Sequence, residues 1–143
     1  MFVTIDASGN VSARNGHEWC LFCGAKNPES FGLCFKRETD GTVYTRFQGY
    51  GNLQGYDGIL HGGVIASLLD VAMTHCLFHQ GIQAVTGDLH VRYVRLISCG
   101  AVLDIRARVL SSVPPLYRLK ADIIVENRVA AWAEAKFMRR RKS

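Results

Sequence analysis

The sequence lacks the features that mark several large classes of protein. No apolar run reaches the roughly 18 residues of a membrane-spanning helix, and the N-terminus has no basic-then-apolar secretion signal. No phosphate-binding loop, nucleophilic serine elbow or dinucleotide fingerprint occurs. Aromatic residues are not interleaved with a basic stripe, the pattern that nucleic-acid binding favours. We therefore expect a soluble, cytoplasmic protein with no membrane span, no nucleic-acid partner and no cofactor.

The composition is that of one globular domain. The chain has 143 residues, of which 48% are hydrophobic, enough for a buried core. Its five cysteines are an odd number, so we expect reduced thiols. Four positive charges of the net +5 lie in the tail at 139–142, which we expect to be solvated. We divide the chain into a flexible arm at 1–18 and a single domain at 19–143.

The hydrophobic pattern predicts one long helix among strands. Apolar residues repeat with helical spacing from Gly63 to about Gln80, and they cover nearly every face of that helix. Residues 31–48 indicate two strands joined by a turn at Asp40-Gly41. Four further strands are predicted at 84–97, 101–112, 117–127 and 129–140. An α+β architecture follows, with an antiparallel sheet curled around one central helix.

One aspartate interrupts the predicted helix. Asp70 lies at the edge of the apolar stripe, and none of its neighbours three or four residues away is a cation. An ionised carboxylate in such surroundings is costly unless hydrogen bonds compensate. Asp70 therefore either faces water or bonds to a neighbouring strand, or it serves as a catalytic base or nucleophile.

Two glycines at the start of the helix favour the catalytic interpretation. Gly62 and Gly63 leave the first backbone N–H groups uncovered at the positive end of the helix dipole, a place suited to stabilising an oxyanion. Gly62 and Asp70 are eight residues apart, about 12 Å along a helix, so one chain cannot bring both to the same carbonyl. A two-fold dimer with antiparallel helices would do so. We therefore expect equivalent sites shared across a homodimer interface.

Several distinctive motifs occur along the chain between Trp19 and Met138. His61-Gly62-Gly63 is followed by Asp70, and the strand TGDLHVRYVRLI comes after the helix. The N-terminal stretch WCLFCGAKNPESFGLCF and the loop LQGYDGILHGG precede them. Together these motifs resemble the hotdog-fold acyl-CoA thioesterases of the phenylacetate-pathway type.

The resemblance implies a fold, an assembly and an activity. The fold is the hotdog fold, a curled antiparallel sheet wrapped around one long helix, assembled as homodimers or as homotetramers made of two dimers. The activity is hydrolysis of acyl-CoA to free acid and CoA. By position, Asp70 would be the general base or nucleophile, and the N–H of Gly62 or Gly63 would polarise the thioester carbonyl. His61 would help position that carbonyl, and Thr86 would assist Asp70 from the facing strand.

The chain departs from the family pattern in one place. Several members carry an asparagine six residues before the His-Gly pair, where this chain has Gly55. Gln54 is the candidate to replace that asparagine in contacting the thioester or the attacking water.

If the substrate is a CoA ester, its phosphates need cations. Arg92 and Arg95 are the candidates, together with the basic tail.

The cysteines and histidines raise the question of a metal. His17, Cys20, Cys23 and Cys34 are candidate zinc ligands, because Cys-x-x-Cys is a common half-site. A second paired half-site is missing, and the family resemblance implies that the motif forms a structural turn, so we expect no metal. His75 and His79 lie four residues apart without the glutamate of a His-Glu-x-x-His motif, which favours an exposed helix end.

One alternative function stays open. A hotdog protein that binds or senses acyl-CoA without turning it over fits the same motifs. Asp70 favours the enzyme, because a binding protein gains nothing from a costly carboxylate near the acyl group.

Overall fold

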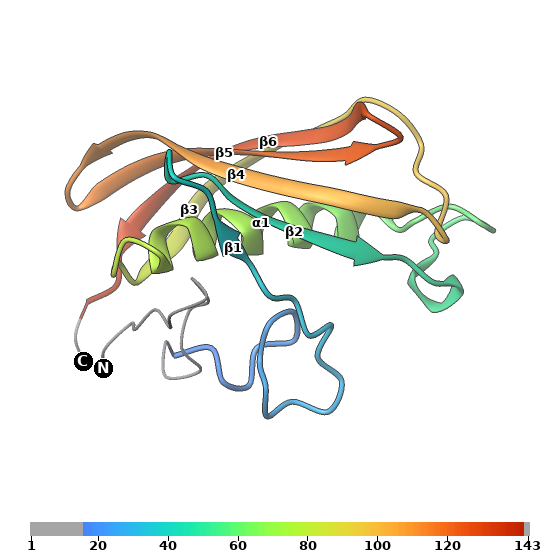
Figure 1. Cartoon of the computed structure of the whole chain (residues 1–143), viewed down its shortest axis with the longest axis horizontal. Helices are drawn as coiled ribbons and strands as arrows, with labels where there is room; N and C mark the ends of the chain where they lie inside the picture. Colours follow the sequence, from blue (N-terminus) through green and yellow to red (C-terminus); the bar gives the residue numbers. More distant parts are fainter. Residues whose placement is uncertain (1–15, 142–143) are drawn as a thin grey trace.

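A computed structural model describes residues 16–141 of the chain. These residues form one α-helix, a short 3₁₀ helix and a six-stranded antiparallel sheet (Figure 1). The elements follow one another as β1 (Lys36–Arg37), β2 (Val43–Gln48), η1 (Gly51–Leu53), α1 (Gly62–Phe78), β3 (Ala84–Tyr93), β4 (Val102–Val113), β5 (Leu116–Val125) and β6 (Arg128–Arg139). The strand order is β1-β2-β4-β5-β6-β3, so β1 and β3 are the edge strands.

The helix α1 occupies the middle of the molecule. Figure 1 shows the sheet curving over one side of α1, with the segment that precedes β1 on the other side. The helix contacts every strand from β2 to β6, and eleven of its seventeen residues are buried. A helix that is apolar on nearly all faces needs cover on both sides, and these two layers provide it. The predicted curled sheet around one central helix is confirmed.

The sheet presents one face to this core. In β4, Leu103, Ile105 and Ala107 are buried while Arg106 and Arg108 point outward, as the alternation predicts. The outer face carries ion pairs, Arg106 with Glu38 at 2.9 Å among them. Such exposed pairs contribute little to stability.

One strand prediction needs correction, and the basic tail is less separate from the domain than expected. The turn at Asp40-Gly41 is present, with Gly41 at a φ of +92°, but β1 spans only two residues instead of the longer strand expected before the turn. Arg139, Arg140 and Arg141 are exposed, as expected for a solvated tail, but Arg139 also ends β6 and its guanidinium donates to the Tyr117 hydroxyl at 2.9 Å. Arg140 likewise contacts Gln83, at 3.4 Å. The tail is therefore partly fixed to the domain.

The prediction of an exposed helix end at His75 and His79 is wrong. Both residues are buried. Residues 16–35 cover this end of α1: the His17 ring lies 5.0 Å from Phe78, and the Phe35 ring stacks on His75 at 4.7 Å. This covering segment, residues 16–35, contains no helix or strand.

Two further predictions concern the N-terminal arm and a membrane-spanning helix. Residues 1–15 of the expected arm lie outside the described residues. Within residues 16–141, no helix is long and apolar enough to cross a membrane.

Candidate active site

The N-terminus of α1 is capped by a histidine. The Nδ1 atom of His61 accepts a hydrogen bond from the backbone N–H of Gly63 at 2.8 Å. The N–H of Val64 donates to the His61 carbonyl at 3.0 Å. Among the described residues, the N–H of Gly62 has no such acceptor, so it is the free donor of this helix end. Of the two glycines predicted to polarise a carbonyl, the geometry therefore favours Gly62.

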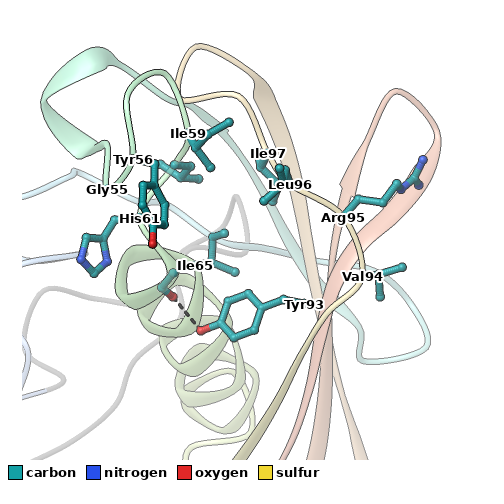
Figure 2. A pocket seen from close by; sticks show the side chains of 12 residues that line it. Gly55, Tyr56, Ile59, His61, Ile65, Tyr93, Val94, Arg95, Leu96 and Ile97 are labelled. Carbon is teal, nitrogen blue, oxygen red and sulfur yellow. Dashed lines mark hydrogen bonds between the residues drawn. The ribbon is translucent and has the colours of Figure 1, made fainter.

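Tyr93 is a functional candidate that the sequence analysis missed. Its hydroxyl donates to the Gly62 carbonyl at 2.8 Å, and its ring lies beside Gly62 (Figure 2). The bond ties the end of β3 to the first residue of α1 and so fixes the position of the free N–H. Only the alternation along β3 could have pointed to Tyr93, and a bulge between Thr86 and Asp88 breaks that alternation.

A pocket of about 600 Å³ opens beside this helix end. Figure 2 shows it between the 55–61 loop and the 93–97 segment, above Ile65 of α1. Most of its wall is apolar, with polar atoms from His61, Tyr93 and Arg95; the lining consists of Gly55, Tyr56, Ile59, Leu60, His61, Gly62, Ile65, Tyr93, Val94, Arg95, Leu96 and Ile97. Tyr56 and Leu96 at its edge are 88% and 83% exposed. An apolar pocket with few polar groups is typical of a small-molecule site.

Asp70 lies two turns further along α1 and is paired with a strand. The Thr86 hydroxyl donates to Asp70 Oδ1 at 2.5 Å. Burial raises the pKa of the Asp70 carboxyl above its usual value, and the Thr86 hydrogen bond opposes that shift. No lysine or arginine forms an ion pair with Asp70 within residues 16–141, and the attraction of His17 lowers the Asp70 pKa less than burial raises it. The carboxylate is thus oriented by a neutral donor and left basic.

The structure brings some predicted residues together and leaves others apart. His61, Gly62 and Gly63 meet at the helix start, and Asp70 meets Thr86, but neither Asp70 nor Thr86 lines the pocket of the same chain. Gln54 uses its side-chain oxygen to accept from the Gly58 N–H at 3.0 Å, so it stabilises the loop before the helix.

The two predicted phosphate ligands differ in their surroundings. Arg95 lines the pocket, and its guanidinium donates to the Val129 carbonyl at 3.0 Å. Arg92 is exposed on β3, opposite Trp132 of β6. Both are accessible to an anion near the pocket mouth or the sheet edge.

Three potential metal ligands lie close together elsewhere. Among the described residues, His17, Cys20 and Cys23 are the one group of three or more side chains with metal-binding atoms in mutual reach, and Cys34 is not part of it.

Comparison with protein families finds one match. Residues 57–112 match the model of the thioesterase superfamily. The acyl-coenzyme A thioesterase THEM4 of Rattus norvegicus is 31% identical over 74 residues, which are 52% of this chain and 32% of that protein. The chain thus spans about a third of the length of the curated relatives that it matches.

Solved structures share the fold. A thioesterase superfamily protein superposes with a TM-score of 0.76 at 24% identity, covering 82% of this chain and 61% of that one. The PaaI protein of the E. coli phenylacetic acid degradation operon superposes with a TM-score of 0.70 at 19% identity, covering 79% and 83%. At these identities the likeness establishes the fold, and the predicted hotdog fold is confirmed.

Proposed function

We propose, on the premise that this chain is a hotdog-fold member of the thioesterase superfamily, that it is an acyl-CoA thioesterase. Water adds to the acyl carbon, the C–S bond breaks, and the CoA sulfur leaves and takes up a proton. The observation that carries the proposal is the Asp70 carboxylate, held by Thr86 in an apolar helix, with a pKa raised by burial and no ion pair to a lysine or arginine among residues 16–141. A chain that merely bound acyl-CoA would gain no advantage from this arrangement.

The free N–H of Gly62 polarises the thioester carbonyl. It lies at the positive end of α1 and borders the apolar pocket, so a carbonyl oxygen seated there receives a hydrogen bond and the field of the helix dipole. Both effects strengthen as negative charge develops on the oxygen during attack. His61 and Tyr93 act on this donor indirectly: His61 caps the helix through Gly63, and Tyr93 holds the Gly62 carbonyl.

Asp70 promotes the attack on the acyl carbon. As a general base it takes a proton from water, and as a nucleophile it forms an anhydride that water then cleaves; the geometry is compatible with either route. Its raised pKa makes the carboxylate a stronger base than an exposed aspartate. The Thr86 hydroxyl keeps one carboxylate oxygen occupied, which leaves the other to act on water or substrate.

The complete site needs a second copy of the chain. Asp70 is about 12 Å along α1 from Gly62 and does not line the pocket of its own chain. The strand that carries Thr86, β3, is an edge strand of ten residues, seven of them exposed, and such an edge is a template for pairing with another chain. A two-fold homodimer would bring Asp70 of one chain to the Gly62 end of the other. Pairs of such dimers would form a homotetramer.

The substrate class follows from the relative and the pocket. THEM4 is named an acyl-coenzyme A thioesterase, and the apolar wall beside Gly62 suits an acyl chain. Arg92 and Arg95 are the proposed contacts for CoA phosphates, and Gln54 the proposed contact near the thioester.

A thiol-release assay tests the activity. Short, medium, long and aryl acyl-CoAs are offered to the wild type and to Asp70→Asn, which keeps the shape of the side chain and removes its charge. We expect CoA release by the wild type from at least one class and loss of most of it in the variant. If the wild type binds acyl-CoA but releases no thiol from any class, the chain is the non-catalytic binding protein and the enzyme proposal fails.

A subunit-mixing experiment tests the shared site. Gly62→Pro removes the donor in one subunit, and Asp70→Asn removes the carboxylate in the other. Verified heterodimers of the two variants should regain part of the activity, because one of their two sites keeps both groups. Heterodimers as inactive as either parent would show that each site is built from one chain.

A further inference from the structure

The segment before β1 forms a tight turn against the core. The N–H of Cys20 donates to the His17 carbonyl at 3.0 Å, and the N–H of Gly24 donates to the Cys20 carbonyl at 2.8 Å. A Cβ at Gly24 would collide with backbone atoms of Cys20 and Glu18, so the chain folds back on itself here only because position 24 is glycine. The Cys-x-x-Cys-Gly motif therefore forms the structural turn that the family resemblance implies.

This turn gathers three metal-binding atoms. His17 Nδ1, Cys20 Sγ and Cys23 Sγ all lie within 4.8 Å of one another, and His17 Nδ1 is 3.5 Å from Cys23 Sγ. The backbone N–H of Phe22 points at Cys20 Sγ at 3.3 Å. Such a hydrogen bond favours a thiolate, the form of cysteine that binds metals. The side chains are half-buried, so an ion from solvent can reach them.

We propose that His17, Cys20 and Cys23 bind a zinc ion, with water completing the tetrahedron. Zn–S and Zn–N distances of about 2.3 and 2.0 Å place the two sulfurs and the nitrogen of a tetrahedral site about 3.5 to 3.8 Å apart, so the observed cluster closes on an ion with small side-chain adjustments. Binding releases the two thiol protons to solvent and forms two Zn–S bonds and one Zn–N bond. The charges balance, because one Zn²⁺ neutralises two thiolates and the imidazole stays neutral.

The third ligand distinguishes this site from a simple dithiol pair. Two cysteines at this spacing fit a disulfide or a metal half-site equally well. A disulfide needs no histidine nitrogen directed at its second sulfur, whereas a metal site gains its third corner from one. Cys34, the other candidate in this segment, is exposed and lies outside the group.

The site also has a structural consequence. His17 packs on Phe78 at the end of α1, and Phe22 and Cys23 pack against the core. Residues 16–35 have no helix or strand of their own. A bound ion would fix the turn that covers this end of the helix, and metal binding would add to folding stability.

The test is metal content, which does not depend on turnover. The full chain is reduced, exchanged into buffer with zinc, freed of excess metal and analysed by elemental mass spectrometry. We expect about one zinc per chain in the wild type, and affinity at least about tenfold weaker in Cys20→Ser and Cys23→Ser. Cys34→Ser is the matched control from the same segment and should keep the metal.

A second measurement guards against variants that fail to fold. Titrating the wild type with Co²⁺ should give the absorption bands of thiolate-bound, tetrahedral cobalt, and His17→Ala should weaken or remove them. The proposal is overturned if the reduced wild type retains no zinc and gives no thiolate–cobalt bands. It is equally overturned if Cys34→Ser loses metal as fully as Cys20→Ser, or if the protein holds a Cys20–Cys23 disulfide and stays metal-free after reduction.

Discussion

Gly62→Pro removes a single hydrogen-bond donor from the proposed site. Proline is favoured at the first position of a helix, where the missing N–H has no partner within the helix. The preceding residue, His61, has φ −62° and ψ 134°, the extended conformation that a following proline requires. Because the Gly62 N–H has no acceptor among residues 16–141, no structural hydrogen bond is lost. The substitution should therefore change the chemistry and leave the helix folded.

The magnitude follows from the role of that donor. Loss of one donor to a developing oxyanion costs about 2.7 to 4 kcal/mol, a fall of roughly 100- to 1000-fold in kcat. Gly62→Ala is the matched variant: it keeps the N–H, and its Cβ would lie 3.5 Å from the Tyr93 ring, an ordinary contact. It should lose far less activity than the proline variant.

The assay is thiol release under saturating acyl-CoA, with thermal unfolding measured in parallel. Gly62→Pro should melt close to the wild type while kcat falls by the stated factor. The reasoning is refuted if the folded proline variant keeps a third or more of the wild-type kcat, or if the alanine and proline variants lose equal activity. In either case the donor at this helix end is not the group that stabilises the oxyanion.

Three further outcomes follow from the groups around α1. Thr86→Val removes a charge-assisted hydrogen bond to Asp70 that is worth about 1.5 kcal/mol at an exposed position. On the acid side of the pH profile, kcat/KM should therefore fall about tenfold in this variant, whereas Thr86→Ser should keep the wild-type kcat/KM. Equal pH profiles for the two variants would contradict this role of Thr86. Asp70→Asn should raise the free energy of unfolding at neutral pH, because the raised pKa of Asp70 means that its ionised carboxyl destabilises the fold. This gain in stability should vanish below pH 3.8, the unperturbed pKa of the carboxyl. Urea denaturation at pH 7 and at pH 3 measures the difference. Burial lowers the pKa of His75 from 6.5 to about 3, so the contribution of His75 to stability should be full above pH 6.5. The free energy of unfolding should then fall by up to about 1.4 kcal/mol per pH unit as the pH drops towards 3. A His75→Leu variant should lose this pH dependence, and an unchanged slope in that variant would mean that other groups cause it.

The sequence predicted the fold because its periods are clear. Seventeen residues that are apolar on nearly every face can only be a central helix, and strands such as β4 alternate with a period of two. The prediction of an exposed helix end at His75 was wrong. The cover over that end is a segment of irregular turns, and irregular turns leave no period in the sequence.

The residues of the candidate site that lie on the helix itself were predictable from the sequence. Asp70 was conspicuous as an unpaired carboxylate, and the two glycines were conspicuous at the helix start. The distinction between them was not predictable, because it depends on the His61 side chain turning back to accept the Gly63 N–H. Tyr93 was not predictable either, since its partner is a backbone carbonyl 31 residues earlier in the chain.

The bulge in β3 explains how one strand serves both ends of the site. Thr86 bonds to Asp70 and Tyr93 bonds to Gly62, so both side chains face α1, as do Leu89 and Val91, which pack on the core. Residues 86 and 93 are an odd number of positions apart, and strict alternation would turn one of them to the outer face. The register shift between Thr86 and Asp88 absorbs one residue and restores the common direction. The irregularity that hides Tyr93 from a reading of the sequence is therefore the feature that aligns the strand with both the carboxylate and the free N–H of the helix.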